Sequence, residues 1–451
     1  MGTAGNAIIQ RFEGRKKMFK NKKFGHYAIL FMILGIVYMF MYSGLQNDQI
    51  NIIQGFSAWD TNKTMSPMTI GNFICIALTF LYGTLFIKYG VRKTMMPCFV
   101  LAALGCIGIA AANGLTATGG SGNYGLYFIS LLVVRCTCMI FQMGGFMLCA
   151  NWFIRYRGRI MGIITLGSPL FSVIGTGVMT TYISKHLGGD YRPFYIGIAI
   201  VIVVMAIVTW FGLRDTPEEA GLYPDGAEQP PKSETGEPEV RLTVGQVLAS
   251  KKGWQLIIAF GAFTFIINAC MGSMVVRYMT LSDGGMGDLS VWLVAVKWLS
   301  LGAILGIPMS YIFGIFDDKL GSVKASIILG LTEFLPILGL MLQPHGGSIP
   351  LMVLWGFGVA CMTGGVPTMH PCITAYCYGR REYQSANRII MAIQLIPSAF
   401  AGQMMQNMMV TGKATQAYTI LLVVLVIGII TMCTMLKTKD ANEADRDYGN
   451  K

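Results

Sequence analysis

Long apolar runs are the feature of this sequence that most restricts its fold. A run of about 20 apolar residues is long enough for one helix to cross the hydrocarbon core of a bilayer. Because lipid offers no hydrogen-bond partners, a crossing segment must pair its own backbone groups, as an α-helix does. We therefore expect an all-α membrane protein with twelve transmembrane helices. The runs lie near residues 26–46, 66–87, 94–112, 125–150, 159–184, 193–213, 254–279, 289–313, 325–342, 350–377, 387–409 and 415–436.

The composition agrees with a membrane protein and excludes several other classes. Charged residues make up 12% of the chain, against about a quarter in a typical soluble domain. The net charge of +12 does not indicate a nucleic-acid partner, because Lys and Arg lie in short clusters between the apolar runs. The 11 cysteines lie in or beside those runs, where we expect small buried side chains. We expect no cofactor and no metal.

The segment 214–253 between the sixth and seventh runs is acidic and rich in Pro and Gly. Such a segment cannot bury a core, so we expect a flexible linker between two six-helix bundles, residues 26–213 and 254–436. A basic segment, 1–25, and a tail, 437–451, complete the chain. With the N-terminus inside, most of the 34 Lys and Arg residues face the cytoplasm, as positive residues prefer. The exceptions are five outer residues and two within spans: Lys63, Lys185, Arg192, Arg277 and Lys413; Arg135 and Lys297.

One charged, glycine-containing turn occurs twice in the sequence. "GTLFIKYGVRK" begins at Gly83 and joins the second and third runs, and "GIFDDKLGSVK" begins at Gly314 and joins the eighth and ninth. The equivalent positions indicate a duplicated six-helix unit with an axis along the membrane normal. The candidate residues of these loops, whose gating role is implied by the family resemblance given next, are Gly83, Lys88, Gly90 and Arg92 in the first copy and Gly314, Asp318, Lys319 and Gly321 in the second.

These loops resemble a signature of the major facilitator superfamily, roughly Gly-x-Leu-x-Asp-Arg/Lys-x-Gly-x-Arg/Lys. The first copy has Ile87 in place of the acid, which removes the usual gate-locking ion pair from that half. Asp317 and Asp318 are expected to compensate in part in the second half. The resemblance extends over about residues 25–436. It implies two pseudo-symmetric bundles that rock about a central site, a lipid bilayer as the environment, and a monomer.

Shorter segments resemble a narrower group. "GSPLFSVIG" (Gly167–Gly175) is similar to the Gly-Pro motif of antiporters, with Ser168 inserted. "TPEEAGLYPDG" and "YGRREYQSANRII" resemble bacterial carboxylate carriers such as oxalate–formate antiporters. This resemblance implies a carrier of small organic anions in the cytoplasmic membrane of a bacterium.

Two cations within the expected spans are the leading substrate-binding candidates. A charge inside a bilayer is costly unless it faces a cavity or a partner. Arg135 and Lys297 lie on opposite halves, where they are expected to hold an anionic substrate, Arg through its planar fork and Lys as a point charge. The alternatives are that Arg135 bonds helix carbonyls and that Lys297 extends to the outer interface.

Polar and aromatic side chains are expected to complete the pocket. Tyr38 and Tyr42 are four residues apart, hence on one helix face, and Gln394 is on the eleventh helix, which the family resemblance places beside the cavity. Packing roles remain the alternative for each. Further candidates are Gln46, Gln142, Asn268, Trp298, Trp355 and Ser398. His370 and Glu333 are candidates for coupling transport to protons. The alternatives are that His370 packs through a hydrogen bond and that Glu333 is protonated or structurally paired.

The pattern as a whole predicts a secondary transporter of a small carboxylate that works by alternating access, as an antiporter or as a symporter whose substrate brings its own proton. A transporter of bulky amphipathic compounds, such as drugs or bile acids, is the main alternative. A channel or a transport-inactive sensor is a weaker one. The chain has no nucleophile, phosphate-binding or metal motif that indicates an enzyme.

Overall fold

The structure is a computed structural model, and the part of the chain that it describes contains twelve helical spans long and apolar enough to cross a membrane. The predicted all-α membrane fold is therefore confirmed. The basic segment and the tail expected at the two ends lie largely outside the described residues. The described residues are 21–48, 53, 56–59, 61–115, 122–154, 156–228, 242–283, 289–439 and 441.

The first half contains six spans, of which the fifth is the least regular. That span consists of four consecutive segments, and its η3 segment is a π-helix, a wider and less common form than the α-helix. In chain order the elements are α2 (Lys22–Ser43) with η1 (Gly44–Asp48), α4 (Thr61–Tyr89), α5 (Val91–Ala112), α6 (Tyr124–Trp152), α7 (Arg157–Ile164), α8 (Gly167–Phe171), η3 (Ser172–Met179), α9 (Thr180–His186) and α10 (Arg192–Gly212).

The second half repeats this plan after a short helix. Its tenth and eleventh spans are joined into one helix, α16, with a bend at Gly379, whose φ of 71° is accessible chiefly to glycine. The elements are α11 (Val244–Ala249), α12 (Lys251–Thr280), α13 (Leu289–Leu320), α14 (Ser322–Thr332), α15 (Phe334–Met341), α16 (Ile349–Val410) and α17 (Ala414–Cys433).

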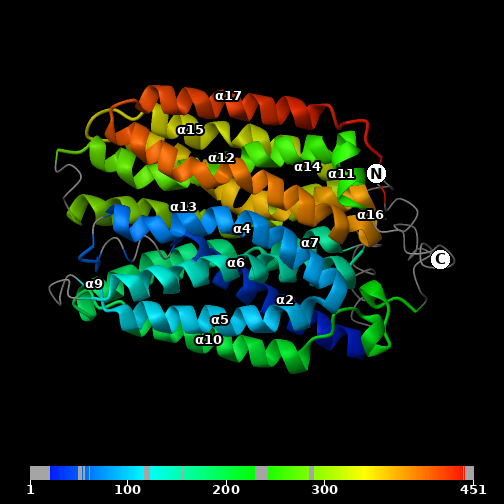
Figure 1. Cartoon of the computed structure of the whole chain (residues 1–451). Helices are drawn as coiled ribbons and strands as arrows, with labels where there is room; N and C mark the ends of the chain where they lie inside the picture. The colour runs from blue at the N-terminus through cyan, green and yellow to red at the C-terminus, as the bar shows by residue number, and fades with distance from the viewer. Residues whose placement is uncertain are drawn as a thin grey trace.

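The two halves lie side by side along their length. In Figure 1 the helices of the first half, blue to green, occupy the lower part of the view, and those from α12 to α17 occupy the upper part. Within the halves, α5 packs between α6 and α10, and α12 packs against α16 and α17. Contacts of α4 with α16 and of α7 with α13 join the halves, so any space enclosed between them is bordered by both.

The duplicated turns have the same backbone conformation. Gly90 precedes α5 with φ 88° and ψ 164°, and Gly321 precedes α14 with φ 84° and ψ 154°. Residues with a Cβ rarely adopt such angles, so glycine is required at both positions. We call the end of the bundle that contains these turns the repeat end. The opposite end, where α9 finishes at the left of Figure 1, is the distal end.

Both ends of the expected linker are folded onto the repeat end. The backbone N–H of Ile154 donates to Asp225 Oδ2 over 3.1 Å, and that of Leu242 donates to Glu382 Oε2 over 2.7 Å. The first part contains η4 (Glu218–Ala220) and η5 (Pro224–Gly226). Residues 229–241 lie outside the described part of the chain. Within the described residues, the linker thus hydrogen-bonds to both bundles, through Asp225 in its first part and through Leu242, which donates to Glu382 of α16, in its last part.

Candidate functional site

A small cavity of about 110 Å³ lies between the two halves. It is bordered by α2, η1, α6, α8 and η3 of the first half and by α12 and α16 of the second. Most of its polar groups are neutral amides and hydroxyls, and none of its lining residues is acidic. The lining residues are Tyr42, Ser43, Gln46, Gln142, Phe146, Ser168, Ser172, Thr264, Ile267, Asn268, Met271, Thr363, Val366, Pro367, His370, Met391, Gln394 and Leu395.

The lining follows a helical spacing of four residues. Ser168 and Ser172 form one such pair, and Thr264 and Asn268 form another, because residues four apart lie on one face of a helix. Of the polar lining residues, Tyr42, Gln46, Gln142, Asn268, His370 and Gln394 were predicted from the sequence, whereas Ser43, Ser168, Ser172, Thr264 and Thr363 were not. Polar pairs at this spacing inside apolar runs were the available signal for the missed residues.

His370 and Gln394 are the most informative polar groups in the cavity. Both side chains are 4% exposed and line the cavity, and they approach each other. Among the described residues, neither His370 Nε2 nor Gln394 Oε1 has a hydrogen bond of normal geometry. A buried polar atom without a partner destabilises the protein by about 1–3 kcal/mol. Such atoms at a cavity indicate that a ligand or water completes their bonding.

Arg135 lies behind the cavity wall rather than in its lining. Its Nε donates to Asn72 Oδ1 over 2.5 Å, and its Nη1 donates to Cys138 Sγ over 3.0 Å. The guanidinium also interacts electrostatically with the hydroxyl of Tyr42, which does line the cavity. Within the described part of the chain, no carboxylate forms an ion pair with it. Arg135 thus keeps its positive charge beside Tyr42 without an ion-pair partner among the described residues.

Lys297 lies elsewhere, in a separate crevice at the distal end. Its side chain is exposed, and it lines this crevice together with Lys185 and His186. Arg135 and Lys297 therefore do not face one common space in this conformation. The expected clamp of two cations around one anion is not formed here, because the two side chains leave their helices toward different neighbours.

Three aromatic candidates are also placed outside the cavity lining. Tyr38 is fully buried, and its hydroxyl forms a 2.6 Å hydrogen bond with Thr209 Oγ1 on α10. Trp355 is fully buried among apolar residues, and Trp298 is half-buried. These positions fit a packing role, which was the alternative given for each of the three residues.

Glu333 does not line the cavity and is fully buried, at the junction of α14 and α15. Among the described residues, neither of its carboxyl oxygens has a hydrogen-bond partner. An unpaired buried carboxylate is strongly unfavourable, so a neutral, protonated Glu333 fits this position. His370 is thus the one coupling candidate that contacts the cavity.

Direct contacts between the halves close the cavity on its repeat-end side. Thr165 and Thr368 share a 2.7 Å hydrogen bond across the boundary. Nearer the repeat end, Arg159 Nε lies 2.6 Å from Asp318 Oδ2. Gly158 and Gly314 are packed so closely that a Cβ on Gly314 would lie 2.8 Å from the Gly158 carbonyl oxygen. The structure is therefore closed at the repeat end.

The other loop residues contribute less to this closure. Lys88 and Lys319 are exposed, and the Lys88 ammonium lies over the ring of Tyr89 in its own half. Arg92 pairs with Asp215 of the linker and not with the second half. Gly83 allows α4 to pack against Arg388 of the second half. Of the paired charges, Asp318 is the loop residue that links the halves.

Comparisons with known proteins agree with this architecture. The model of the family described as Major Facilitator Superfamily matches residues 23–402. The solved structure of the proton:xylose symporter XylE, bound to 6-bromo-6-deoxy-D-glucose, superposes with a TM-score of 0.64 at 14% identity. That superposition covers 93% of this chain and 98% of the symporter.

A second similarity covers part of the chain. Monocarboxylate transporter 10 from Danio rerio is 23% identical over 199 residues, which is 44% of this chain and 36% of that protein. The chain thus spans about a third of the length of this relative. The family match covers most of the residues that surround the cavity, and the chain belongs to the Major Facilitator Superfamily, whose members are membrane transporters and not enzymes.

Proposed function

We propose that this protein is a secondary active transporter of a small organic anion, a carboxylate, and that it works by alternating access. The observation that carries the proposal is the chemistry of the central cavity. His370 Nε2 and Gln394 Oε1 are buried without a hydrogen bond of normal geometry among the described residues, and the cavity lining contains no acid. The amides of Gln142, Asn268 and Gln394 supply N–H donors at the lining, and Arg135 interacts electrostatically with Tyr42, which also lines it. An anion placed there meets hydrogen-bond donors and a nearby positive charge.

The size of the cavity supports a small substrate. About 110 Å³ is available, whereas one water occupies about 30 Å³ of liquid volume. A carboxylate of a few carbon atoms fits that space, and the amides of Gln142 and Gln394 can donate to its oxygens. The similarity to a monocarboxylate transporter supports the same substrate class. A narrower relation to oxalate–formate antiporters remains part of the proposal.

Coupling is proposed to involve exchange of anions or entry of the substrate together with its proton. A separate proton relay would need acidic or basic side chains at the cavity, and its described lining contains no Asp, Glu, Lys or Arg and one histidine, His370. We assign His370 the role of a hydrogen-bond partner that can also accept the proton of an incoming acid. Glu333 is given no part in coupling because it does not line the cavity.

The repeat end is proposed to face the cytoplasm of a bacterial cell, since most Lys and Arg residues gather there. In that orientation both termini and the linker are cytoplasmic, and this conformation is closed toward the cytoplasm. Opening would require the halves to separate at Arg159 and Asp318. We propose that the two loop copies form the gate and that the carrier works as a monomer.

Substrate counterflow in proteoliposomes tests the proposal. Vesicles preloaded with an unlabelled mono- or dicarboxylate should accumulate the same labelled acid, without an imposed proton gradient. Measurements at two pH values separate anion exchange, which is little affected, from proton symport, which rises in acid. The absence of counterflow for all small acids, together with transport of cationic or neutral amphipathic drugs, would refute the proposed substrate class.

A pair of variants links transport to the cavity. Gln394→Leu removes an amide at the cavity and is expected to lower carboxylate affinity by about tenfold or more, since a hydrogen bond to a charged group contributes roughly 1.5–3 kcal/mol. Gln403→Leu is the matched control, because Gln403 is exposed on the same helix. Equal effects of the two changes would contradict a role for the cavity.

Arg135 requires its own comparison because it is buried. Arg135→Gln is expected to weaken anion binding while Arg135→Lys, which keeps the charge, retains more of it. A thermal unfolding measurement on each variant distinguishes lost binding from lost folding. If both variants fold and bind the carboxylate as tightly as the original protein, Arg135 has no electrostatic role at the cavity.

A further inference from the structure

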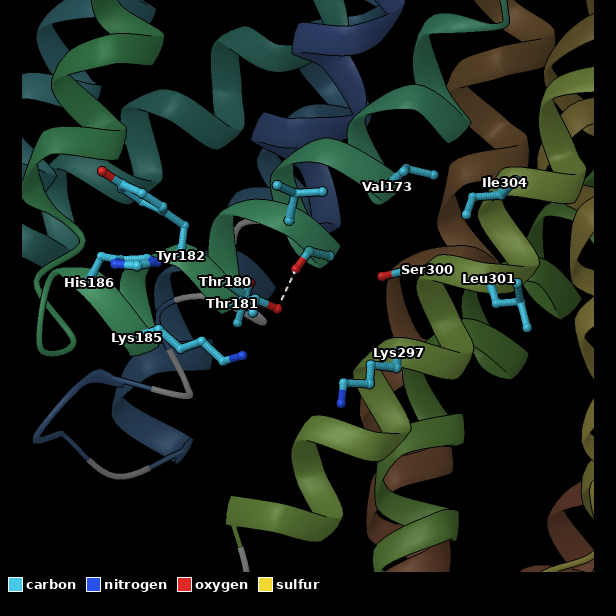
Figure 2. Close-up of a pocket in the computed structure, with 12 residues that line it drawn as sticks. Val173, Thr180, Thr181, Tyr182, Lys185, His186, Lys297, Ser300, Leu301 and Ile304 are labelled. Atoms are coloured by element: carbon cyan, nitrogen blue, oxygen red, sulfur yellow. Dashed lines mark hydrogen bonds between the residues drawn. The ribbon is translucent and has the colours of Figure 1, made fainter.

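A second and larger space lies at the distal end, between η3–α9 of the first half and α13 of the second. This crevice encloses about 590 Å³, several times the volume of the central cavity. Figure 2 shows its two walls, with one group of side chains on each. The residues that line it are Val173, Gly177, Val178, Thr180, Thr181, Tyr182, Lys185, His186, Lys297, Ser300, Leu301 and Ile304.

Cations gather at the distal part of the crevice. Lys185 and Lys297 extend from opposite walls toward the gap in Figure 2. Within the described residues, neither ammonium group has an ion pair or a hydrogen bond to an acceptor. Two like charges that face one gap repel each other, and an anion placed between them would satisfy both. His186 stacks against Tyr182, with ring centroids 5.0 Å apart, and adds a third basic group.

One part of the crevice is apolar. It is formed by Val173 on η3 and by Leu301 and Ile304 on α13, and Leu301 and Ile304 are exposed at its surface. The hydroxyl of Thr180 is buried at the crevice and has no hydrogen-bond partner among the described residues. The crevice is therefore an open groove with two lysines, a buried unpartnered hydroxyl and an apolar wall, which is complementary to an amphipathic anion.

The crevice lies between the two halves, and its lining residues come from both. Lys185 belongs to the first half and Lys297 to the second, so a bound anion would connect the halves at the distal end. The η3 segment borders both spaces, since Ser172 lines the central cavity and Val173 lines the crevice. A ligand stabilises the conformation to which it binds best. An occupant would therefore stabilise the conformation that is closed at the repeat end.

We propose that this crevice binds an amphipathic organic anion, with a carboxylate between Lys185 and Lys297 and an apolar body along Val173, Leu301 and Ile304. Such an anion holds the carrier in the conformation described here and slows transport through the central cavity. Its binding is independent of the proposed function; its effect on transport rests on that function.

The test uses dodecanoate as the probe, with the full chain in nanodiscs of phosphatidylcholine. Binding should fall by about tenfold for Lys185→Gln or Lys297→Gln, as expected for loss of one charge-assisted hydrogen bond, and further for the double variant. Lys413→Gln is the control, because Lys413 is exposed and outside the crevice. Dodecanol, which has the same chain without the charge, should compete poorly.

Transport provides the second measurement. Dodecanoate should slow counterflow of a small carboxylate by the original protein but much less by the double lysine variant, whose uninhibited counterflow should persist. If no small acid is transported at all, the proposed function fails while the binding assay still tests the crevice.

Two results would overturn the inference. Dodecanoate binding that is unchanged in the double variant would place the site elsewhere. Loss of dodecanoate binding when phosphatidylglycerol is added to the nanodiscs, with lysine-dependent retention of that lipid, would assign the crevice to a phospholipid headgroup instead of a free organic acid.

Discussion

The two copies of the duplicated loop share a backbone conformation but differ in their partners. Gly90 and Gly321 have nearly the same φ and ψ angles. In the first copy, Arg92 Nε lies 3.3 Å from Oδ1 of Asp215, a residue of the linker. In the second copy, Asp318 lies 2.6 Å from Arg159 of the opposite half. The two copies thus share the conformation of the turn, whereas the ion pair described between the halves belongs to the second copy.

The difference follows from one position in each copy. Ile87 occupies the place that Asp318 has in the second copy, and an isoleucine cannot form an ion pair. The first copy meets the other half through a different group, since Arg388 Nη1 donates to Thr84 Oγ1 over 3.1 Å and its guanidinium lies 5.4 Å from the Phe80 ring. We infer that closure at the repeat end depends more on the second copy than on the first.

The largest effect is expected from Gly314→Ala in the second copy. A Cβ there would lie 2.8 Å from a backbone oxygen of Gly158, and a backbone atom cannot rotate away. Overpacking of this kind destabilises by about 1–3 kcal/mol, so transport should fall by roughly tenfold. The distance between spectroscopic labels at exposed Lys88 and Lys319 should increase as the repeat end opens.

The control for this change is Gly402→Ala, because no atom lies within 4 Å of the Cβ position at Gly402. It should leave both transport and the label distance unchanged. If the repeat end of the Gly314→Ala variant is as fully closed as that of the original protein, closure does not depend more on the second copy than on the first.

A smaller effect is expected from Asp318→Asn, which removes the ion pair with Arg159. Both side chains are partly exposed, and such pairs contribute up to about 1 kcal/mol, so the open conformation should gain roughly fivefold in population. The same label distance measures this shift. Exchange of the two charges, Arg159→Asp with Asp318→Arg, should restore closure; failure to do so would mean that the pair's charge is not what holds the halves together.

The smallest effect is expected from Arg92→Gln in the first copy. Arg92 pairs with Asp215 of the linker and donates to the Leu213 carbonyl over 2.8 Å. Neither partner belongs to the second half. Thermal stability should therefore fall by less than about 1 kcal/mol, while the label distance stays the same. A shift of the label distance as large as that of Asp318→Asn would show that both copies control closure.

The candidate site was predictable from the sequence only in part. Tyr42, Gln142, His370 and Gln394 were selected as polar residues within apolar helices, and all four line the cavity. Tyr38 was selected by the same reasoning, four residues before Tyr42, but it bonds to Thr209 inside the first half. The spacing places both tyrosines near one face of α2, and the elements packed around each tyrosine determine which one reaches the cavity.

The sequence by itself determined the number and approximate limits of the spanning helices, the two glycine turns and the residues available to bind a substrate. These features depend on local rules: an apolar run must pair its own backbone groups in lipid, and positive φ favours glycine. Only the tertiary structure decided that Arg135 lies behind Tyr42, that Lys297 faces a separate crevice and that Asp318 meets Arg159. In a membrane helix both the lipid-facing and the packed side are apolar, so hydrophobic periodicity carries little information about which face meets which neighbour.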